Sequence, residues 1–116
     1  MDEKLEQALD FSNFRQTLHN QQQTLLSIVN DKLLFSYDNQ IFKATPETIG
    51  LVKTIVDLEY SSVVVDDVNG YPANITNPVE FLNKLISVYS SAKNEHFVGH
   101  KKIQKARSIN KLVNVD

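Results

Sequence analysis

The sequence predicts an α+β fold in which two long helices and one shorter helix pack on a small antiparallel sheet of two hairpins. Three observations predict this class. Apolar residues recur at three- and four-residue steps near both ends of the chain, which is the period of a helix with one apolar face. Between them lie two pairs of short apolar runs, each pair joined by turn-forming residues. Each pair is followed by a side-chain acceptor and a proline, a pattern typical of a helix start.

The first helix is predicted over residues 3–31. Its apolar face is formed by Leu5, Leu9, Phe11, Phe14, Leu18, Leu25, Ile28 and Val29. The run "HNQQQT" at 19–24 interrupts this face with six polar residues. We expect one continuous helix, and a turn between two shorter helices is the alternative.

A hairpin and a helix are predicted over residues 33–59. The two apolar runs flank "YDNQ" at 37–40, where Asp and Asn tolerate turn geometry. Thr45 then precedes Pro46, whose missing N–H costs nothing at the first helical position. This helix is expected to end near Glu59.

A second hairpin and a long helix are predicted over residues 63–110. The run Val63 to Val65 favours a strand, and Asn69-Gly70 can take the positive φ angles of a type I′ turn. Pro72 removes a backbone donor, so the returning strand is expected at an edge or after this residue. "NPVE" at 77–80 has the pattern of a capping box that starts the last helix.

The last helix carries a heptad pattern that predicts a contact with another helix. Its seam, the line of apolar and small residues at alternating steps of three and four, includes Tyr89, Ala92, His96, Gly99, Ile103 and Ala106. Small residues at every second seam position allow a close approach, and Gly99 either breaks the helix or serves that approach. Residues 78–109 would span about 48 Å, more than the roughly 30 Å of a small domain. The overhanging seam needs a partner, either the N-terminal helix or another chain, and we expect a homo-oligomer, most simply a dimer.

Length and composition define the class of protein. The 116 residues, 41% hydrophobic and 22% charged, suit one domain over residues 1–116 with one core. The chain has no cysteine, which excludes disulfides and cysteine chemistry and favours the cytoplasm. We expect no signal peptide and no membrane contact, since no run approaches about 18 apolar residues.

Two histidines four residues apart raise the possibility of a metal site. His96 and His100 form the pattern HxxxH, but Phe97 occupies the position where the zincin pattern has Glu. The sequence also indicates no third metal ligand. We therefore expect no metal and no cofactor, with His96 packed in the seam and His100 toward solvent.

The acidic hairpin has a partial resemblance to a calcium loop. Asp67, Asn69 and Gly70 match three positions of an EF-hand, but Val65 and Thr76 occupy the positions that need Asp and Glu. A turn cap is the better interpretation of the two adjacent aspartates. The three glycines form no phosphate-binding loop, and no catalytic triad spacing is present, so we do not expect an enzyme.

The C-terminal end of the chain is basic, whereas the rest of the chain is acidic. Residues 1–92 carry 6 basic and 12 acidic side chains, whereas residues 93–116 carry 6 basic and 2 acidic ones. Such a cluster can bind phosphates, or it can complement the negative end of the helix dipole. The residues concerned are Lys101, Lys102, Lys105, Arg107 and Lys111.

Three segments carry a family resemblance: "FSNFRQTL", "DDVNGYPANI" and "NEHFVGHKKIQKARSINKLVNVD". Together they resemble small uncharacterised proteins of T4-like marine tailed phages. The resemblance implies a virion or assembly accessory role, with other phage structural proteins as partners, in the host cytoplasm or associated with the virion. We therefore expect a non-enzymatic structural or assembly protein that acts through helix-mediated contacts. The alternative is a nucleic-acid-binding accessory protein that uses the basic end.

Overall fold

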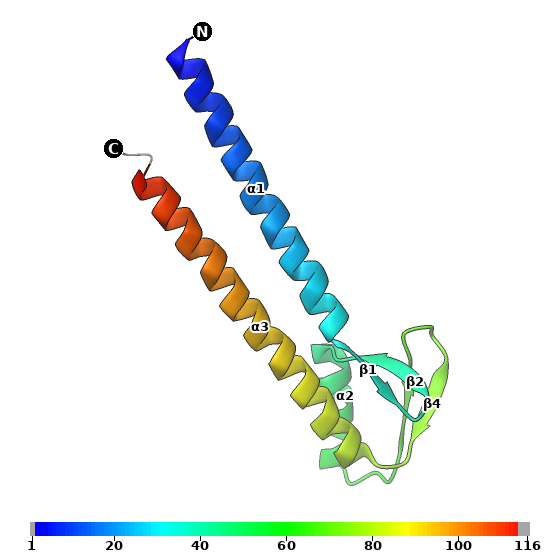
Figure 1. The fold of residues 1–116 in the computed structure, drawn as a ribbon. Helices are drawn as coiled ribbons and strands as arrows, with labels where there is room; N and C mark the ends of the chain where they lie inside the picture. Colours follow the sequence, from blue (N-terminus) through cyan, green and yellow to red (C-terminus); the bar gives the residue numbers. More distant parts are fainter. Residues whose placement is uncertain (1, 114–116) are drawn as a thin grey trace. The chain divides into compact units, whose positions relative to one another are not determined.

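The computed structural model describes the backbone of residues 2–113 and the side chains of residues 2–106 (Figure 1). The elements in chain order are α1 (Glu3–Lys32), β1 (Leu34–Tyr37), β2 (Gln40–Lys43), α2 (Pro46–Asp57), β3 (Val63–Asp66), β4 (Pro72–Ile75) and α3 (Pro78–Val113). This arrangement confirms the α+β class with two long helices, one shorter helix and two hairpins. Over the described residues, no helix combines the length and the apolar character needed to cross a membrane.

The contacts divide the chain into two compact units. We call Met1–Ile28 with Glu95–Asp116 the helical unit, and Val29–Asn94 the mixed unit. Both long helices contribute residues to both units, so this division leaves the single domain a prediction. The buried hydrophobic side chains of the described residues all lie in the mixed unit, namely Val29, Leu33, Phe35, Phe42, Ala44, Val52, Val63, Val65, Ala73, Ile75, Phe81, Leu82, Leu85 and Ala92.

The first hairpin has the turn that the sequence predicts. Leu34 pairs with Lys43 and Tyr37 with Gln40, which leaves a two-residue turn of Asp38 and Asn39. Both turn residues have positive φ angles, 49° and 65°. This is the conformation of a type I′ turn, whose twist matches that of the two strands.

The second hairpin corrects the turn expected at Asn69-Gly70. Because Asp66 pairs with Pro72, the loop has five residues, and Gly70 has a positive φ of 81° whereas Asn69 does not. The Asp67 carboxylate instead organises the loop, accepting from the backbone N–H groups of Asn69 and Tyr71 at 2.9 Å each. These side-chain bonds hold the longer loop, which confirms the turn-cap interpretation of this aspartate.

The hairpins form two separate two-stranded sheets and not one sheet. Two hydrogen bonds connect them: the N–H of Val68 donates to the carbonyl of Ile41 at 2.9 Å, and the Gln40 amide donates to Asp67 at 3.1 Å. The loop of the second hairpin therefore lies against β2. Pro72 begins β4, in agreement with the expected position of a proline at a strand start.

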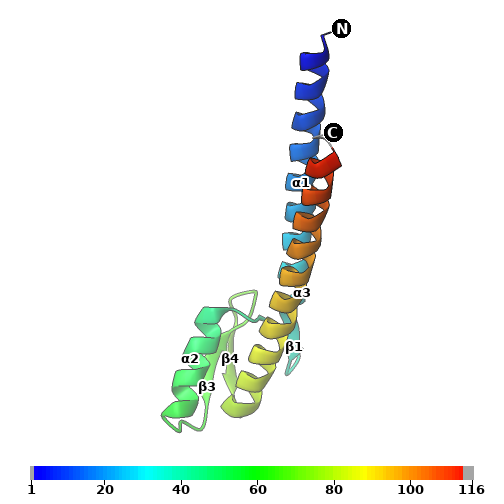
Figure 2. The same cartoon turned by 90° about the vertical axis from the view of Figure 1, so that its left-hand side faces the viewer.

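The core of the mixed unit is organised around Phe81, a fully buried residue of α3. Its ring centroid lies 5.8 Å from that of Phe35, 5.1 Å from Phe42 and 5.0 Å from Tyr37, all on the first hairpin. Edge-to-face contacts of this kind add to the stabilisation that burial provides. On the other hairpin, α2 lies alongside β3 and buries Val52 (Figure 2).

Both predicted helix starts are confirmed. Thr45 Oγ1 accepts from the N–H of Thr48 at 3.2 Å, with Pro46 as the first helical residue. Asn77 Oδ1 accepts from the N–H of Glu80 at 3.2 Å. The return bond comes from the Asn77 side-chain amide to the Glu80 carboxylate at 3.0 Å, whereas a standard capping box uses the backbone N–H.

Both long helices are continuous. Residues 19–24 are helical, so the polar run does not break α1, and α3 continues through Gly99. Within the helical unit the two helices run side by side in opposite directions, in both views (Figures 1 and 2).

Candidate helix-pairing site

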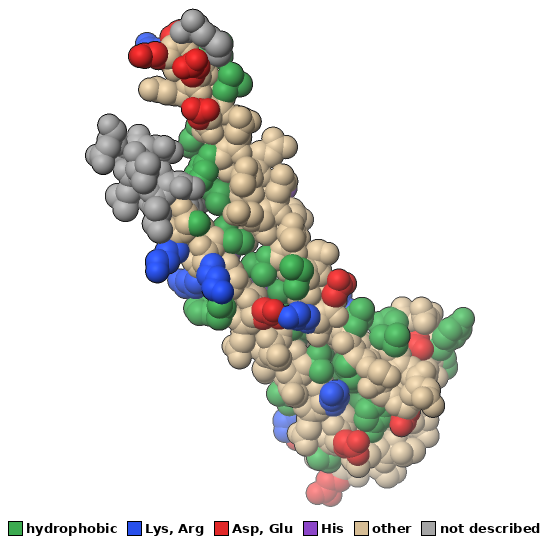
Figure 3. Space-filling view, viewed as in Figure 1, with side chains coloured by type: hydrophobic (Ala, Val, Ile, Leu, Met, Phe, Trp, Pro, Cys, Tyr) green, Lys and Arg blue, Asp and Glu red, His purple; other side chains and the backbone are tan. Residues whose placement is uncertain are grey.

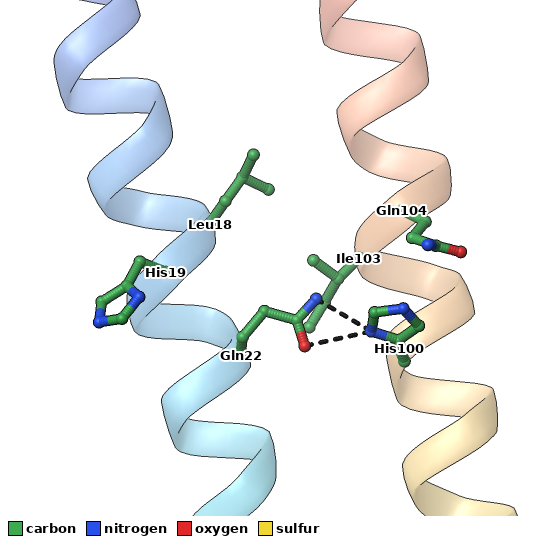
Figure 4. A pocket seen from close by; sticks show the side chains of 6 residues that line it. All are labelled: Leu18, His19, Gln22, His100, Ile103 and Gln104. Carbon is green, nitrogen blue, oxygen red and sulfur yellow. Dashed lines mark hydrogen bonds between the residues drawn. The ribbon is translucent and has the colours of Figure 1, made fainter.

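The helical unit is held by contacts between α1 and α3. Leu25 lies against Gly99, Gln22 against His100, and Leu18 lines the same shallow pocket as Ile103 (Figure 4). As the residue numbers fall along α1 they rise along α3, so the pairing is antiparallel. This pairing identifies the N-terminal helix as the partner of the seam at Gly99.

Gly99 is the point of closest approach. A Cβ atom at this position would lie 2.7 Å from Leu25 Cδ1 and 3.0 Å from Leu25 Cδ2. Carbon atoms attract best at about 3.5 to 4.0 Å, so the missing side chain makes room for this leucine. Of the two interpretations of Gly99, a close approach is therefore correct and a helix break is not.

The histidines are placed differently from the sequence prediction. His100 is half-buried, and its Nδ1 lies 3.1 Å from Gln22 Nε2 and 3.3 Å from Gln22 Oε1. The ring therefore points toward α1 and not to solvent. The Gln22 amide can donate to an unprotonated Nδ1 or accept from a protonated one, so it suits either form of the ring.

His96 is also half-buried, as its seam position predicts, and its ring centroid lies 6.5 Å from that of His100. Leu18, His19, Gln22, His100, Ile103 and Gln104 line the pocket between the helices (Figure 4). Within residues 2–106, no three His, Asp or Glu side chains gather closely enough to hold a metal ion.

The remaining seam residues have different surroundings. Ala92 is 1% exposed and belongs to the core of the mixed unit, and Tyr89 is half-buried beneath the ammonium of Lys93. Ile103 is half-buried on the α1 side, whereas Ala106 is exposed. The seam thus changes along its length from a buried contact to an uncovered one.

The basic cluster lies on the exposed side of α3. Lys101 Nζ lies 5.6 Å from the centroid of the Phe97 ring, one turn earlier. Lys102 and Lys105 are exposed, and neither forms an ion pair with a described residue. The side chains of Arg107 and Lys111, which belong to the predicted cluster, lie outside the described residues.

Over residues 2–28 and 95–106, the helical unit has no buried core, although it carries many apolar side chains. No side chain of its described residues is buried, whereas seven of its large apolar side chains are exposed: Leu5, Leu9, Phe11, Leu26, Ile28, Phe97 and Val98. Figure 3 shows such side chains along both helices, with acidic ones gathered at the N-terminal end of α1. The pair of helices therefore presents apolar surface that it does not cover by itself.

In the mixed unit, two groups have perturbed protonation. Desolvation raises the pKa of the Asp67 carboxyl, but hydrogen bonds from Tyr71, Gln40, Asn69 and Gly70 outweigh it and lower that pKa below its ordinary value. These bonds stabilise the charged form, which suits a structural turn cap.

The second group is the Tyr37 phenol. Burial, and then the negative charges of Glu80 and Asp38, raise its pKa above the ordinary value. This phenol forms no hydrogen bond with a described residue.

The sequence prediction of the site named no residue of α1. Leu18 and Leu25 are seven residues apart, which is one heptad, and Gln22 lies between them. That spacing is the signal that could have identified the α1 side of the contact.

No protein-family model, curated protein or solved structure matches the chain.

Proposed function

We propose that the chain is a non-enzymatic structural or assembly protein that works through helix-mediated contacts, first of all with a second copy of itself. One observation carries this proposal: the described part of the helical unit has no buried side chain, yet seven of its large apolar side chains are exposed. Scattered single apolar residues are normal on protein surfaces, but here all seven lie on two helices whose described side chains include no buried one.

Two helices are too few to bury their own apolar side chains. Most helix stability in proteins comes from packing of an apolar face, and two helices alone bury only one side of each. Further helices would complete the burial, as the four helices of a bundle do. A second copy supplies two such helices with the same exposed residues.

The pocket between α1 and α3 supports the non-enzymatic part of the proposal. The groups lining it are two histidines, two amides and two aliphatic side chains, without a carboxylate or a hydroxyl. His100 is already engaged by an amide that orients no nucleophile. The resemblance to small phage proteins supports a virion or assembly accessory role in the host cytoplasm as part of the same proposal.

The test compares two exposed leucines on helices of different units. Leu9 on α1 is 49% exposed and Leu51 on α2 is 48% exposed. The two positions are therefore matched in residue type, in helical conformation and in exposure. Molar mass measured by light scattering over a range of concentrations should show an oligomer that Leu9→Gln weakens and Leu51→Gln leaves unchanged. Equal effects of the two substitutions, or a monomer throughout, would contradict the proposal.

Nucleic-acid binding is the second candidate, favoured by the neighbourhood of Phe97. This ring is 63% exposed and lies beside Lys101, so it offers a stacking surface next to a cation. Lys102 and Lys105 add positive charge over the following two turns. The acidic residues of the rest of the chain oppose this function, because they would repel a bound duplex.

A further inference from the structure

We infer that two copies pair antiparallel through their helical units, with the N-terminal end of each α1 lying on the basic side of α3 of the other copy. This inference rests on the proposed self-association and adds its orientation and its contact residues. It follows from the register of the two helices, from two matching sets of side chains, and from the position of their charges.

The register shows which part of α1 lacks an intramolecular partner. Gln22 is level with His100, and Leu18 with Ile103. Continued at equal rise per residue, this register places Val113, the last helical residue of α3, level with about residue 9 of α1. The turns of α1 before residue 9 therefore extend beyond the last helical residue of α3. Leu5 lies in these turns and Leu9 is level with their end, and they are 52% and 49% exposed.

These first turns carry a defined face, which we call the α1 tip face: Asp2, Leu5, Glu6 and Leu9. Positions three and four apart share one side of a helix, so the two leucines alternate with the two carboxylates along this face. Glu6 has no ion-pair partner among the described residues. The Asp2 carboxylate accepts from the backbone N–H of Lys4, at 3.1 Å, and has no ion-pair partner among the described residues.

A complementary face lies on α3, which we call the α3 flank: Val98, Lys102, Lys105 and Ala106. Their spacing of four, seven and eight residues again puts them on one side of the helix. Val98 is 51% exposed, and the other three are also exposed. This face offers two small apolar side chains and two lysines, opposite in charge to the α1 tip face.

The two faces cannot meet within one chain. Ala106 is level with about residue 16 of α1, so Leu9 is offset from it by seven residues, about 10 Å along the axis. In a parallel dimer, where both copies point the same way, Leu9 of one copy stays offset by the same distance from Ala106 of the other. An antiparallel dimer with its twofold axis level with about residue 12 of α1 removes it, because residue 9 of one copy is then level with Ala106 of the other.

The same register aligns the charges. Glu6 of one copy is then level with about residue 103 of the other, between Lys102 and Lys105. Because the dimer is symmetric, every contact occurs twice. Exposed ion pairs are weak individually, so the leucines and the doubled contacts supply most of the stabilisation, and the charges select the orientation.

The decisive experiment uses the absence of cysteine from the chain. A variant with Leu9→Cys and Ala106→Cys is oxidised mildly and analysed on a non-reducing gel. The inferred orientation predicts a covalent dimer that reduction reverses, since only there can the Cα atoms come within the roughly 7 Å that a disulfide requires. Leu9→Cys alone should give no covalent dimer; a dimer formed by this single variant would indicate parallel pairing and overturn the inference.

A second measurement does not depend on cysteines. Glu6→Lys should raise the dissociation constant of the dimer about tenfold, because two weak ion pairs per dimer become repulsive. Adding Lys102→Glu and Lys105→Glu to the same chain should restore it, and all three positions are exposed, so folding is not at stake. A dimer that neither forms the disulfide nor responds to the charge reversal overturns this inference and leaves the proposed function standing. A monomer at all concentrations overturns both.

Discussion

Substitution of Gly99 by alanine tests whether close packing against Leu25 holds α1 and α3 together. In an exposed helix interior, alanine is more favourable than glycine by about 1 kcal/mol. At Gly99, however, the new Cβ would lie 2.7 Å from Leu25 Cδ1, so the leucine side chain must move. The chain offers a matched control in Gly50, a helical glycine of α2 whose added Cβ would meet nothing within 4 Å.

The magnitude follows from these two environments. Gly50→Ala should stabilise the protein by up to about 1 kcal/mol, since only the helix preference changes. Overpacking typically costs about 1–3 kcal/mol, so Gly99→Ala should be neutral or destabilising by up to about 2 kcal/mol. The moving atoms end a flexible side chain, which favours the lower half of this range. Gly99→Leu should destabilise more than Gly99→Ala.

The assay is hydrogen exchange of the amides around residue 99, together with urea unfolding followed by circular dichroism. Exchange reports local opening of the helix pair even if the mixed unit stays folded. Adding Leu25→Ala to Gly99→Ala should remove the steric part of the cost, and a double-mutant cycle measures that coupling. Equal stabilisation by Gly99→Ala and Gly50→Ala, with no coupling to Leu25, would refute the reasoning.

Three further predictions concern charge, metal and nucleic acid. Asp67→Asn should lower the thermal midpoint at pH 7. The difference in midpoint between the two proteins should shrink as the pH falls through about 4 and below, because a lowered folded-state pKa stabilises only while the carboxylate is charged. A difference in midpoint that does not depend on pH would contradict this. Stoichiometric zinc or nickel should leave the midpoint unchanged, and a rise of several degrees that His96→Ala or His100→Ala abolishes would establish a metal site. Binding to labelled DNA or RNA should be weak at physiological salt; submicromolar binding with a log–log salt slope of roughly −4 to −5, lost in a Lys101→Glu, Lys105→Glu variant, would favour the nucleic-acid function.

Local signals made most of the fold predictable. Thr45 before Pro46 and Asn77 before Pro78 each place an acceptor and a proline where a helix must start, and both helices start there. Asp38-Asn39 tolerates two positive φ angles, and a two-residue turn follows. Such signals act within a few residues, so no tertiary information is needed to read them.

The second turn was mispredicted for a physical reason. Asn69-Gly70 is a strong signal for a two-residue turn, but the Asp67 carboxylate accepts two backbone donors and holds a longer loop. The contact of Val68 with Ile41 also connects this loop to the other hairpin. A side chain that competes for backbone donors is visible in the sequence, but its success depends on the surrounding structure.

The candidate site was only partly predictable. The heptad pattern identified Gly99 as a position for close approach, but a seam does not specify which helix fills it. The orientation of His100 depends on Gln22, a residue 78 positions away, whose side chain is long enough to reach the ring. The exposure of Leu5 and Leu9 likewise could not be read from their periodicity, because burial depends on how many helices surround a position.

Self-association through the helical unit is the central claim, and the molar mass of the intact chain tests it most directly. Light scattering on the purified protein at about 100 μM would detect a dimer as the main species even if its dissociation constant were near 1 μM. We expect twice the mass of the single chain, falling toward the single-chain mass on dilution. A single-chain mass at this concentration would contradict it.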